Sequence, residues 1–239
     1  MNIQNSISNY LKKNDYKSLN IKAVFFDMDG ILFNSMPFHA WAWCKTFESE
    51  GVTFSEYQAY MNEGRTGAST INEVFLEQKG RIATDLEIQN IYKKKSSFFD
   101  SCGKAKPIDD IHAILNQLKK DGKDIFVVTG SGQESLLNNL NQHFPNIFCK
   151  EKMVTAYDVK YGKPNPEPYL IALKKSHCLP NEVCVVENAP LGVQAGHAAG
   201  LFTIAVNTGI LKDEDLLSQG ADILFHNMKE FYEHYNQIF

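Results

Sequence analysis

The sequence has 239 residues and a mass of 27.0 kDa, which is enough for one large domain or for a core with an inserted module. Its 44% hydrophobic and 22% charged residues exclude a disordered or fibrous chain. The 24 basic and 28 acidic side chains leave a net charge of −4, so we expect no binding to nucleic acid or to an anionic membrane surface. The five cysteines include no CxxC pair, which argues against a zinc ribbon or a disulfide framework.

No run approaches the roughly 20 apolar residues that cross a bilayer, and the polar first twenty residues lack the apolar centre of a signal peptide. We therefore expect a soluble, cytoplasmic protein, and we expect it to be a monomer. Residues 1–20 are rich in Asn, Ser and Lys and precede the first strong apolar run. We interpret them as a mobile N-terminal extension that carries no chemistry.

Short apolar runs alternate with segments of helical periodicity over most of the chain. The first run, IKAVFF at 21–26, is almost continuously apolar, as is typical of a strand buried on both faces of a parallel sheet. The later runs lie at 124–129, 183–186, 201–206 and 222–225, and the helical segments lie at 110–120, 134–143, 166–176 and 191–199. This alternation predicts an α/β fold with a Rossmann-like, doubly wound parallel sheet.

Residues 35–105 interrupt the alternation, because no buried-strand run occurs there. Helical segments follow one another instead, at 38–50, 55–61, 68–79 and 85–99. We interpret this block as an α-helical cap inserted after the first strand. The α/β core then consists of residues 21–34 and 106–239.

Polar side chains follow successive strands, where ligands of open parallel sheets bind. These residues are Asp27 and Asp29 after the first strand, Thr129, Gly130 and Ser131 after the second, Lys163 in the loop GKPNP (162–166), and Glu187 and Asn188 after the strand at 183–186. An isolated Asp-x-Asp pair is often only an Asx-turn cap. Four such groups at successive strand ends indicate a functional site.

The charges of these residues indicate what the site holds. Two carboxylates about 4 Å apart repel each other by about 4 kcal/mol at an effective dielectric constant of 20, and Lys163 alone does not compensate three of them. An all-oxygen ligand set points to Mg²⁺ rather than to zinc. Mg²⁺ beside a lysine and a hydroxyl predicts a phosphoryl site, in which Asp27 attacks phosphorus, Asp29 acts as general acid and base, and Thr129 and Lys163 hold the phosphoryl oxygens. Backbone N–H groups after Gly130 and Ser131 suit the same oxygens.

This arrangement resembles the haloacid dehalogenase-like (HAD) superfamily, over about residues 21–226. The resemblance implies an aspartyl-phosphate mechanism with Asp27 as nucleophile. It also implies a Mg²⁺ site at Asp27, Asp29, Glu187 and Asn188, and it assigns residues 35–105 to the helical cap of the β-phosphoglucomutase-like branch. That branch usually carries Glu-Asp where this chain has Glu187-Asn188, which removes one negative charge.

The cap should set substrate specificity. In mutases of this branch the cap loop is basic, whereas this chain has Glu63 where a lysine is expected and Gly67 where an arginine is expected. We interpret Glu63 as a metal ligand that acts on cap closure, the alternative being a solvated loop acid. The resemblance further implies that Lys95 points into the cleft.

Two interpretations are open for each of three cap residues, Lys95, His39 and Arg65. By the resemblance, His39 takes part in cap closure, and Arg65 binds the leaving phosphate. The alternatives are a solvated helix face for Lys95, a packing residue for His39 and an ion pair within the cap for Arg65.

The segments NSMPFH (34–39), EGRTGAST (63–70), VVTGSGQ (127–133), KYGKPNPEPY (160–169) and VENAPLGVQAG (186–196) are similar to a group of this branch that hydrolyses inorganic pyrophosphate. The resemblance therefore implies a Mg²⁺-dependent inorganic pyrophosphatase. The alternatives are a sugar-phosphate phosphatase or another enzyme acting on a small phosphate ester, a β-phosphoglucomutase, and a non-catalytic HAD-like binding module.

Overall fold

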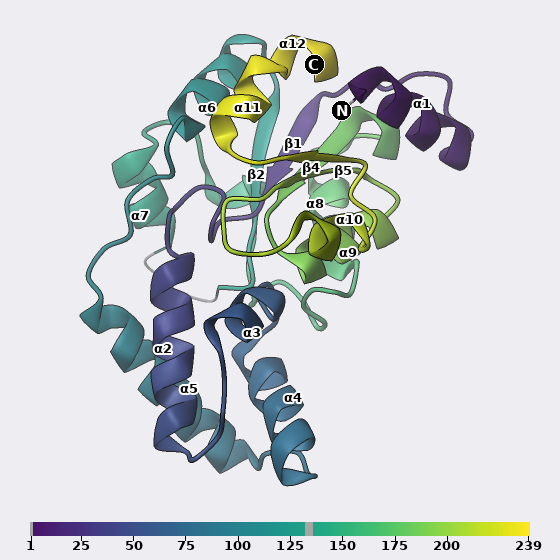
Figure 1. Ribbon diagram of the computed structural model, residues 1–239. Coiled ribbons are helices and arrows are strands. Elements are labelled where there is room, and N and C mark those ends of the chain that lie inside the picture. Colours follow the sequence, from purple (N-terminus) through teal and green to yellow (C-terminus); the bar gives the residue numbers. More distant parts are fainter. Residues whose placement is uncertain (1, 132–135) are drawn as a thin grey trace.

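The computed structural model describes residues 2–131 and 136–239 (Figure 1). Within these residues six parallel strands form one sheet in the order β3-β2-β1-β4-β5-β6. The strands are β1 (Ala23–Phe26), β2 (Asp124–Val128), β3 (Met153–Val154), β4 (Val183–Glu187), β5 (Phe202–Val206) and β6 (Ile223–Phe225). The strand order reverses between β1 and β4, which confirms the predicted doubly wound α/β fold. Strand β3 was not predicted, because two residues are too short to give a pattern.

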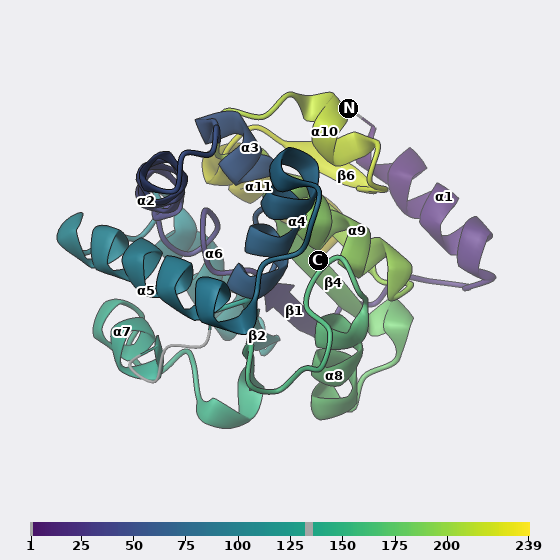
Figure 2. The same cartoon turned by 90° about the horizontal axis from the view of Figure 1, so that it is seen from below.

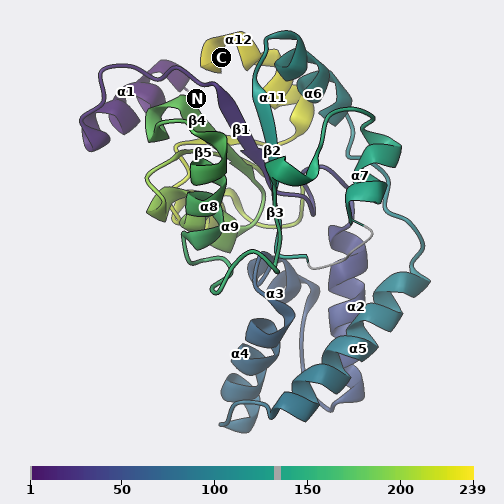
Figure 3. The same ribbon diagram turned by 180° about the vertical axis from the view of Figure 1, so that it is seen from behind.

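Both faces of the sheet are covered, which explains the continuous apolar runs. In β1, Val24 and Phe26 belong to one core cluster and Ala23 and Phe25 to another on the opposite face. One face carries α6 (Ile111–Lys120), α7 (Leu136–His143), α11 (Met228–Glu233) and α12 (Tyr235–Ile238), and α8 (Glu167–Ser176) and α9 (Pro190–Ala198) lie on the other, as Figure 3 shows. The short helix α10 (Asp213–Leu217) follows β5. Residues 134 and 135 of the predicted helix 134–143 lie outside the described residues.

The prediction of a mobile N-terminal extension was wrong. Residues Ile3–Asn14 form helix α1, whose N-cap Asn2 accepts a hydrogen bond from a backbone N–H of the first turn. Ile3 and Tyr10 are buried against the core, and the Tyr10 hydroxyl donates to the carbonyl of Gly200 at 3.0 Å. Apolar residues at positions 3, 7, 10 and 11 carry the helical periodicity that signals this packing.

Residues 35–105 form four helices below the carboxyl edge of the sheet (Figures 1 and 2): α2 (Met36–Ser49), α3 (Glu56–Met61), α4 (Gly67–Lys79) and α5 (Asp85–Ser101). They share an apolar cluster that includes Trp43, Phe47 and Phe75 and that extends to Val193 of α9. The chain leaves and re-enters the core at adjacent points, since the N–H of Asn34 donates to the carbonyl of Lys106 at 2.9 Å. We interpret these helices as the cap. No helix in the described ranges has the length and apolar character needed to cross a membrane.

Candidate active site

A buried lysine joins two carboxylates at the carboxyl ends of β1 and β4. Lys163 Nζ donates to Asp27 Oδ1 and to Glu187 Oε1, each at 2.6 Å, and to the carbonyl of Val128 at 3.0 Å. All three side chains are almost completely buried. Burial alone would lower the pKa of Lys163, but the two carboxylates raise it above its ordinary value. The lysine is therefore a fixed positive charge in the site.

Both carboxylate oxygens of Glu187 are occupied by protein donors. Oε1 accepts from Lys163 and from the Tyr169 hydroxyl at 2.6 Å, and Oε2 accepts from the N–H groups of Asn188 and Ala189 at 3.1 and 3.3 Å. A Cβ atom at Gly192 would collide with this carboxylate. Helix α9 therefore packs against Glu187 at a distance that only a glycine permits. The geometry assigns Glu187 to holding Lys163 and speaks against the predicted role as a metal ligand.

Two buried oxygen atoms remain as acceptors. Asp27 Oδ2 and Asn188 Oδ1 have no hydrogen-bond partner among the described residues. Burial raises the pKa of Asp27 to about 7, with Glu187 and Asp29 adding to the effect and Lys163 opposing it. A hard cation would satisfy both oxygen atoms and relieve the carboxylate charge, so these residues fit Mg²⁺. In the described part of the chain no three His, Cys, Asp or Glu side chains gather as a metal site.

A hydrogen-bonded chain links Asp29 to the cap. Asp29 Oδ1 accepts from the Ser35 hydroxyl at 2.5 Å and lies 3.2 Å from His39 Nε2, while Lys95 Nζ lies 2.7 Å from His39 Nδ1. Since the lysine ammonium can only donate, His39 carries its proton on Nε2 and donates to Asp29. Burial alone would raise the pKa of Asp29, but His39 and Ser35 hold it below its ordinary value. Asp29 is therefore ionised and placed to accept a proton.

Lys95 does not lie on a solvated helix face. It is only 7% exposed, and its Nζ lies 4.9 Å from the ring centre of Phe99 and 5.4 Å from that of Trp43. Burial lowers its pKa, although Glu63 and Asp29 oppose the shift. The ring of His39 packs on Phe99, with centroids 4.2 Å apart. His39 thus both packs in the cap and contacts Asp29.

The cap loop closes directly over the core loops. An added Cβ at Gly64 would lie 3.1 Å from Lys163 Cδ, and one at Gly130 would lie 3.2 Å from the carbonyl oxygen of Gly64. A small cavity of about 10 Å³, about the space of one water, lies between Gly64 of the cap and Gly130 of the core. Glu63 is half-buried, and burial, Asp29 and Asp27 raise its pKa to about 8.

Thr129 lies buried beside these groups, and its Oγ1 accepts from the N–H of Ser131 at 3.0 Å. Arg65 lies near polar side chains of the cap. Its Nη1 lies 3.7 Å from Glu73 Oε2 and 3.4 Å from Ser69 Oγ, all within the cap. The structure thus brings together the predicted core residues with Glu63, Lys95 and His39. The role of Tyr169 was missed although the residue lies in the segment 160–169, because the sequence does not show that its hydroxyl reaches Glu187.

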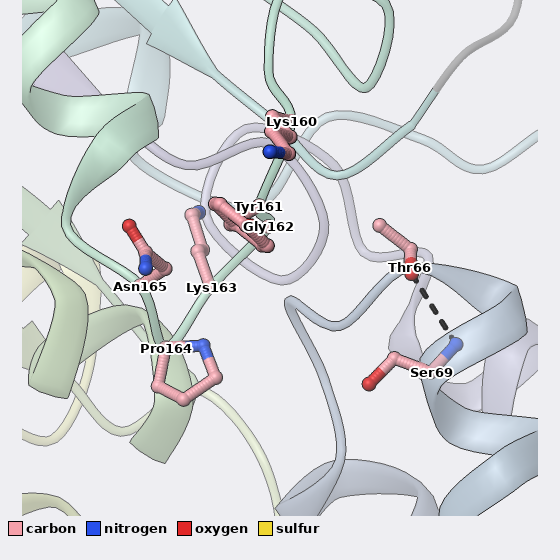
Figure 4. Close-up of a pocket in the computed structure, with 8 residues that line it drawn as sticks. All are labelled: Thr66, Ser69, Lys160, Tyr161, Gly162, Lys163, Pro164 and Asn165. Atoms are coloured by element: carbon pink, nitrogen blue, oxygen red, sulfur yellow. Dashed lines mark hydrogen bonds between the residues drawn. The ribbon is translucent and has the colours of Figure 1, made fainter.

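Two hollows flank this cluster. One, of about 390 Å³, opens beside Asp29 and is lined by side chains that include Phe99, Asn138, Asn139 and Gln142. The other, of about 460 Å³, lies between Thr66 and Ser69 of the cap and residues 160–165 of the core, which face one another in Figure 4. Lys163 directs its ammonium away from this second hollow, toward Asp27 and Glu187. Asp29 lines the first hollow, and Lys163 lines the second.

Comparison with known proteins places this site in a family. A model of haloacid dehalogenase-like hydrolases matches residues 24–206. The chain belongs to this family. A solved structure from Bacteroides vulgatus, provisionally described as a beta-phosphoglucomutase, is 52% identical with a TM-score of 0.95, and the match covers 99% of this chain and 96% of that one.

Curated relatives of this hydrolase family are more distant. Hexitol phosphatase A of Escherichia coli is 28% identical over 209 residues, which cover 87% of this chain and 92% of the relative. Beta-phosphoglucomutase of Bacillus subtilis is 23% identical over 222 residues, which cover 90% and 97%. Both matches extend over most of this chain.

Proposed function

We propose that this hydrolase is a Mg²⁺-dependent phosphatase that uses Asp27 as its nucleophile, and that its substrate is inorganic pyrophosphate. The observation that carries the proposal is the buried Lys163 between Asp27 and Glu187, with Asp27 Oδ2 and Asn188 Oδ1 lacking a hydrogen-bond partner in the part of the chain that the structure describes. Curated relatives named as phosphatases of hexitols and of phosphorylated carbohydrates support phosphate removal as the reaction class.

The residues of this chain can carry out the proton transfers and can form and break the bonds to phosphorus. An oxygen of Asp27 bonds to phosphorus while the bond from phosphorus to the leaving oxygen breaks, and that oxygen receives a proton from Asp29. Water then attacks the aspartyl phosphate, gives its proton to Asp29, and releases phosphate. Because Asp29 is ionised at rest, it must first gain a proton, and the chain from Lys95 through His39 offers a route. Mg²⁺, held by Asp27 and Asn188 and approached by Glu63, would neutralise charge on the phosphoryl oxygens.

The cap supports pyrophosphate as the substrate. Glu63 and Lys95 are cap residues whose charges act on Asp29, and Gly64 of the cap loop packs closely on the Lys163 side chain. Pyrophosphate is small and densely charged and travels with Mg²⁺. A cap carboxylate next to a metal-bound anion is then attracted to the cation, whereas it would repel a bare phosphate ester.

A sugar or polyol phosphate is the second candidate. Relatives act on such compounds by name, and the hollow of about 390 Å³ beside Asp29 presents three neutral amides, those of Asn138, Asn139 and Gln142. Amide groups both donate and accept, so they suit the hydroxyl groups of a neutral leaving group.

Phosphate release measured with pyrophosphate, sorbitol 6-phosphate and β-glucose 1-phosphate, with Mg²⁺ and with a chelator, separates these candidates. We expect kcat/KM for pyrophosphate to exceed the others by at least about tenfold, which corresponds to about 1.4 kcal/mol of transition-state stabilisation. A higher value for either sugar phosphate would overturn pyrophosphate as the substrate. Release of phosphate from none of them would favour a binding module.

A further inference from the structure

The hollow of about 460 Å³ lies where the cap meets the core, and its lining is basic. Thr66 and Ser69 of the cap form one wall, and residues 160–165 of the core form the other, as Figure 4 shows. Hollows of this size commonly hold small ligands. Its two charged lining residues are Lys160 and Lys163, and within the described ranges no carboxylate lines it. Because Lys163 is engaged by the catalytic carboxylates, Lys160 supplies the charge that a ligand would meet.

Lys160 is exposed and its charge is not paired. Its Nζ lies 5.0 Å from the ring centre of Tyr161, and it forms no ion pair with any residue that the structure describes. Glu167 holds the backbone of this loop, since its two oxygen atoms accept from the N–H groups of Lys160 and Tyr161 at 2.9 and 2.8 Å. The ammonium group of Lys160 therefore remains to attract an anion.

The polar side chains of both walls can still donate hydrogen bonds. Asn165 Oδ1 accepts from the N–H of Glu167 at 2.9 Å, which leaves the NH₂ group of Asn165 to donate. Thr66 Oγ1 accepts from the N–H of Ser69 at 3.3 Å, and Ser69 Oγ accepts from Arg65 Nη1 at 3.4 Å. Neither hydroxyl donates to an acceptor among the described residues. A hollow that offers donors beside a lysine suits a ligand that only accepts, such as the oxygen atoms of a phosphate group.

We propose that this hollow is a second anion site, in which a phosphate group binds between the cap and the core, apart from the catalytic carboxylates. The site goes beyond the proposed hydrolysis, because neither Asp27 nor Mg²⁺ takes part in it. Both walls contact the ligand only while Thr66 and Ser69 lie opposite Lys160, so a bound phosphate group favours this closed arrangement of the cap. The phosphate group belongs either to inorganic phosphate or to a phosphorylated metabolite.

Binding of inorganic phosphate in the presence of a chelator separates this site from the catalytic one. Without Mg²⁺ the ionised Asp29 and its neighbouring carboxylates repel a phosphate anion, whereas the hollow presents Lys160. Equilibrium dialysis with radiolabelled phosphate should therefore find about one bound phosphate per chain. Sorbitol 6-phosphate is then added as a competitor. Displacement at a lower concentration than unlabelled phosphate requires would assign the site to a phosphorylated metabolite, and displacement at a higher concentration would assign it to inorganic phosphate.

Three variants test the walls of the hollow, and each lowers the net charge by one unit. Asn165→Asp keeps an acceptor for the N–H of Glu167, and Ser69→Asp changes the cap wall. We expect each to weaken phosphate binding by about tenfold or more, because a donor is replaced by a like charge. Lys160→Gln should weaken it by about threefold or more. Lys12→Gln, at an exposed lysine of α1, makes the same change in net charge and should leave binding unchanged.

Wild-type protein that binds no phosphate in the chelator, or that binds it no more tightly than the two aspartate variants do, would refute the second anion site. A loss in Asn165→Asp without a loss in Ser69→Asp would refute binding between the cap and the core. Thermal unfolding checks that the variants are folded, and Lys160→Gln decides if an aspartate variant is not. The assay involves no turnover, so failure of the proposed substrate leaves its result unchanged.

Discussion

Replacing Tyr169 with phenylalanine removes one hydroxyl from the buried ion cluster and leaves every charge in place. The lost hydrogen bond, 2.6 Å long, ends on the fully buried carboxylate of Glu187. A hydrogen bond to a charged group contributes about 1.5–3 kcal/mol to stability. Glu187 keeps Lys163 and two backbone N–H donors, so its charge is not left unpaired. We therefore expect the free energy of unfolding to fall by about 2 kcal/mol, or Tm by about 4–8 °C for a chain of this size.

Urea denaturation of Tyr169→Phe beside Tyr235→Phe measures this effect. The Tyr235 hydroxyl also donates to a carboxylate, Asp121 Oδ2 at 2.7 Å, but Asp121 is exposed and water replaces the lost donor. We expect Tyr235→Phe to lose less than about 1 kcal/mol. Because Lys163 remains bound to Asp27, kcat for Tyr169→Phe should fall by less than about tenfold. Equal losses in the two variants would refute the view that Glu187 depends on Tyr169 to hold Lys163.

Further predictions concern the nucleophile, the packing of α9 and the metal. Asp27→Asn should abolish phosphate release in a folded protein, because an amide oxygen does not form the acyl phosphate; residual turnover with the usual Mg²⁺ dependence would contradict the mechanism. Gly192→Ala, which drives a methyl group into the Glu187 carboxylate, should cost about 2–4 kcal/mol in urea denaturation. Mg²⁺ affinity, measured by calorimetry, should rise with pH as Asp27 and Glu63 lose their protons near pH 7 and 8. In Glu63→Gln the part of the increase near pH 8 should be lost. Asn188→Ala should weaken Mg²⁺ binding by about tenfold or more.

The sequence predicted most of the sheet and the place of the site. A strand buried on both faces needs apolar residues throughout, so β1, β2, β4, β5 and β6 were visible as runs. The carboxyl ends of parallel strands share one edge, so the groups after each strand had to lie near one another. Strand β3 was missed because it has only two residues, and helix α1 because its apolar stripe lies in a polar segment.

The sequence by itself thus determined which chemical groups reach the carboxyl edge of the sheet, because chain order and strand direction fix that set. Only the tertiary structure decided how they pair. Positions 93, 94 and 95 are all lysines, yet only Lys95 is buried against His39. Successive residues of a helix point in different directions, so α5 turns only one of the three toward the interior. In the same way α8 brings the Tyr169 hydroxyl to Glu187, while Asn188 Oδ1 has no hydrogen-bond partner within the described residues. Contacts of this kind join residues far apart in the chain, and no local pattern records them.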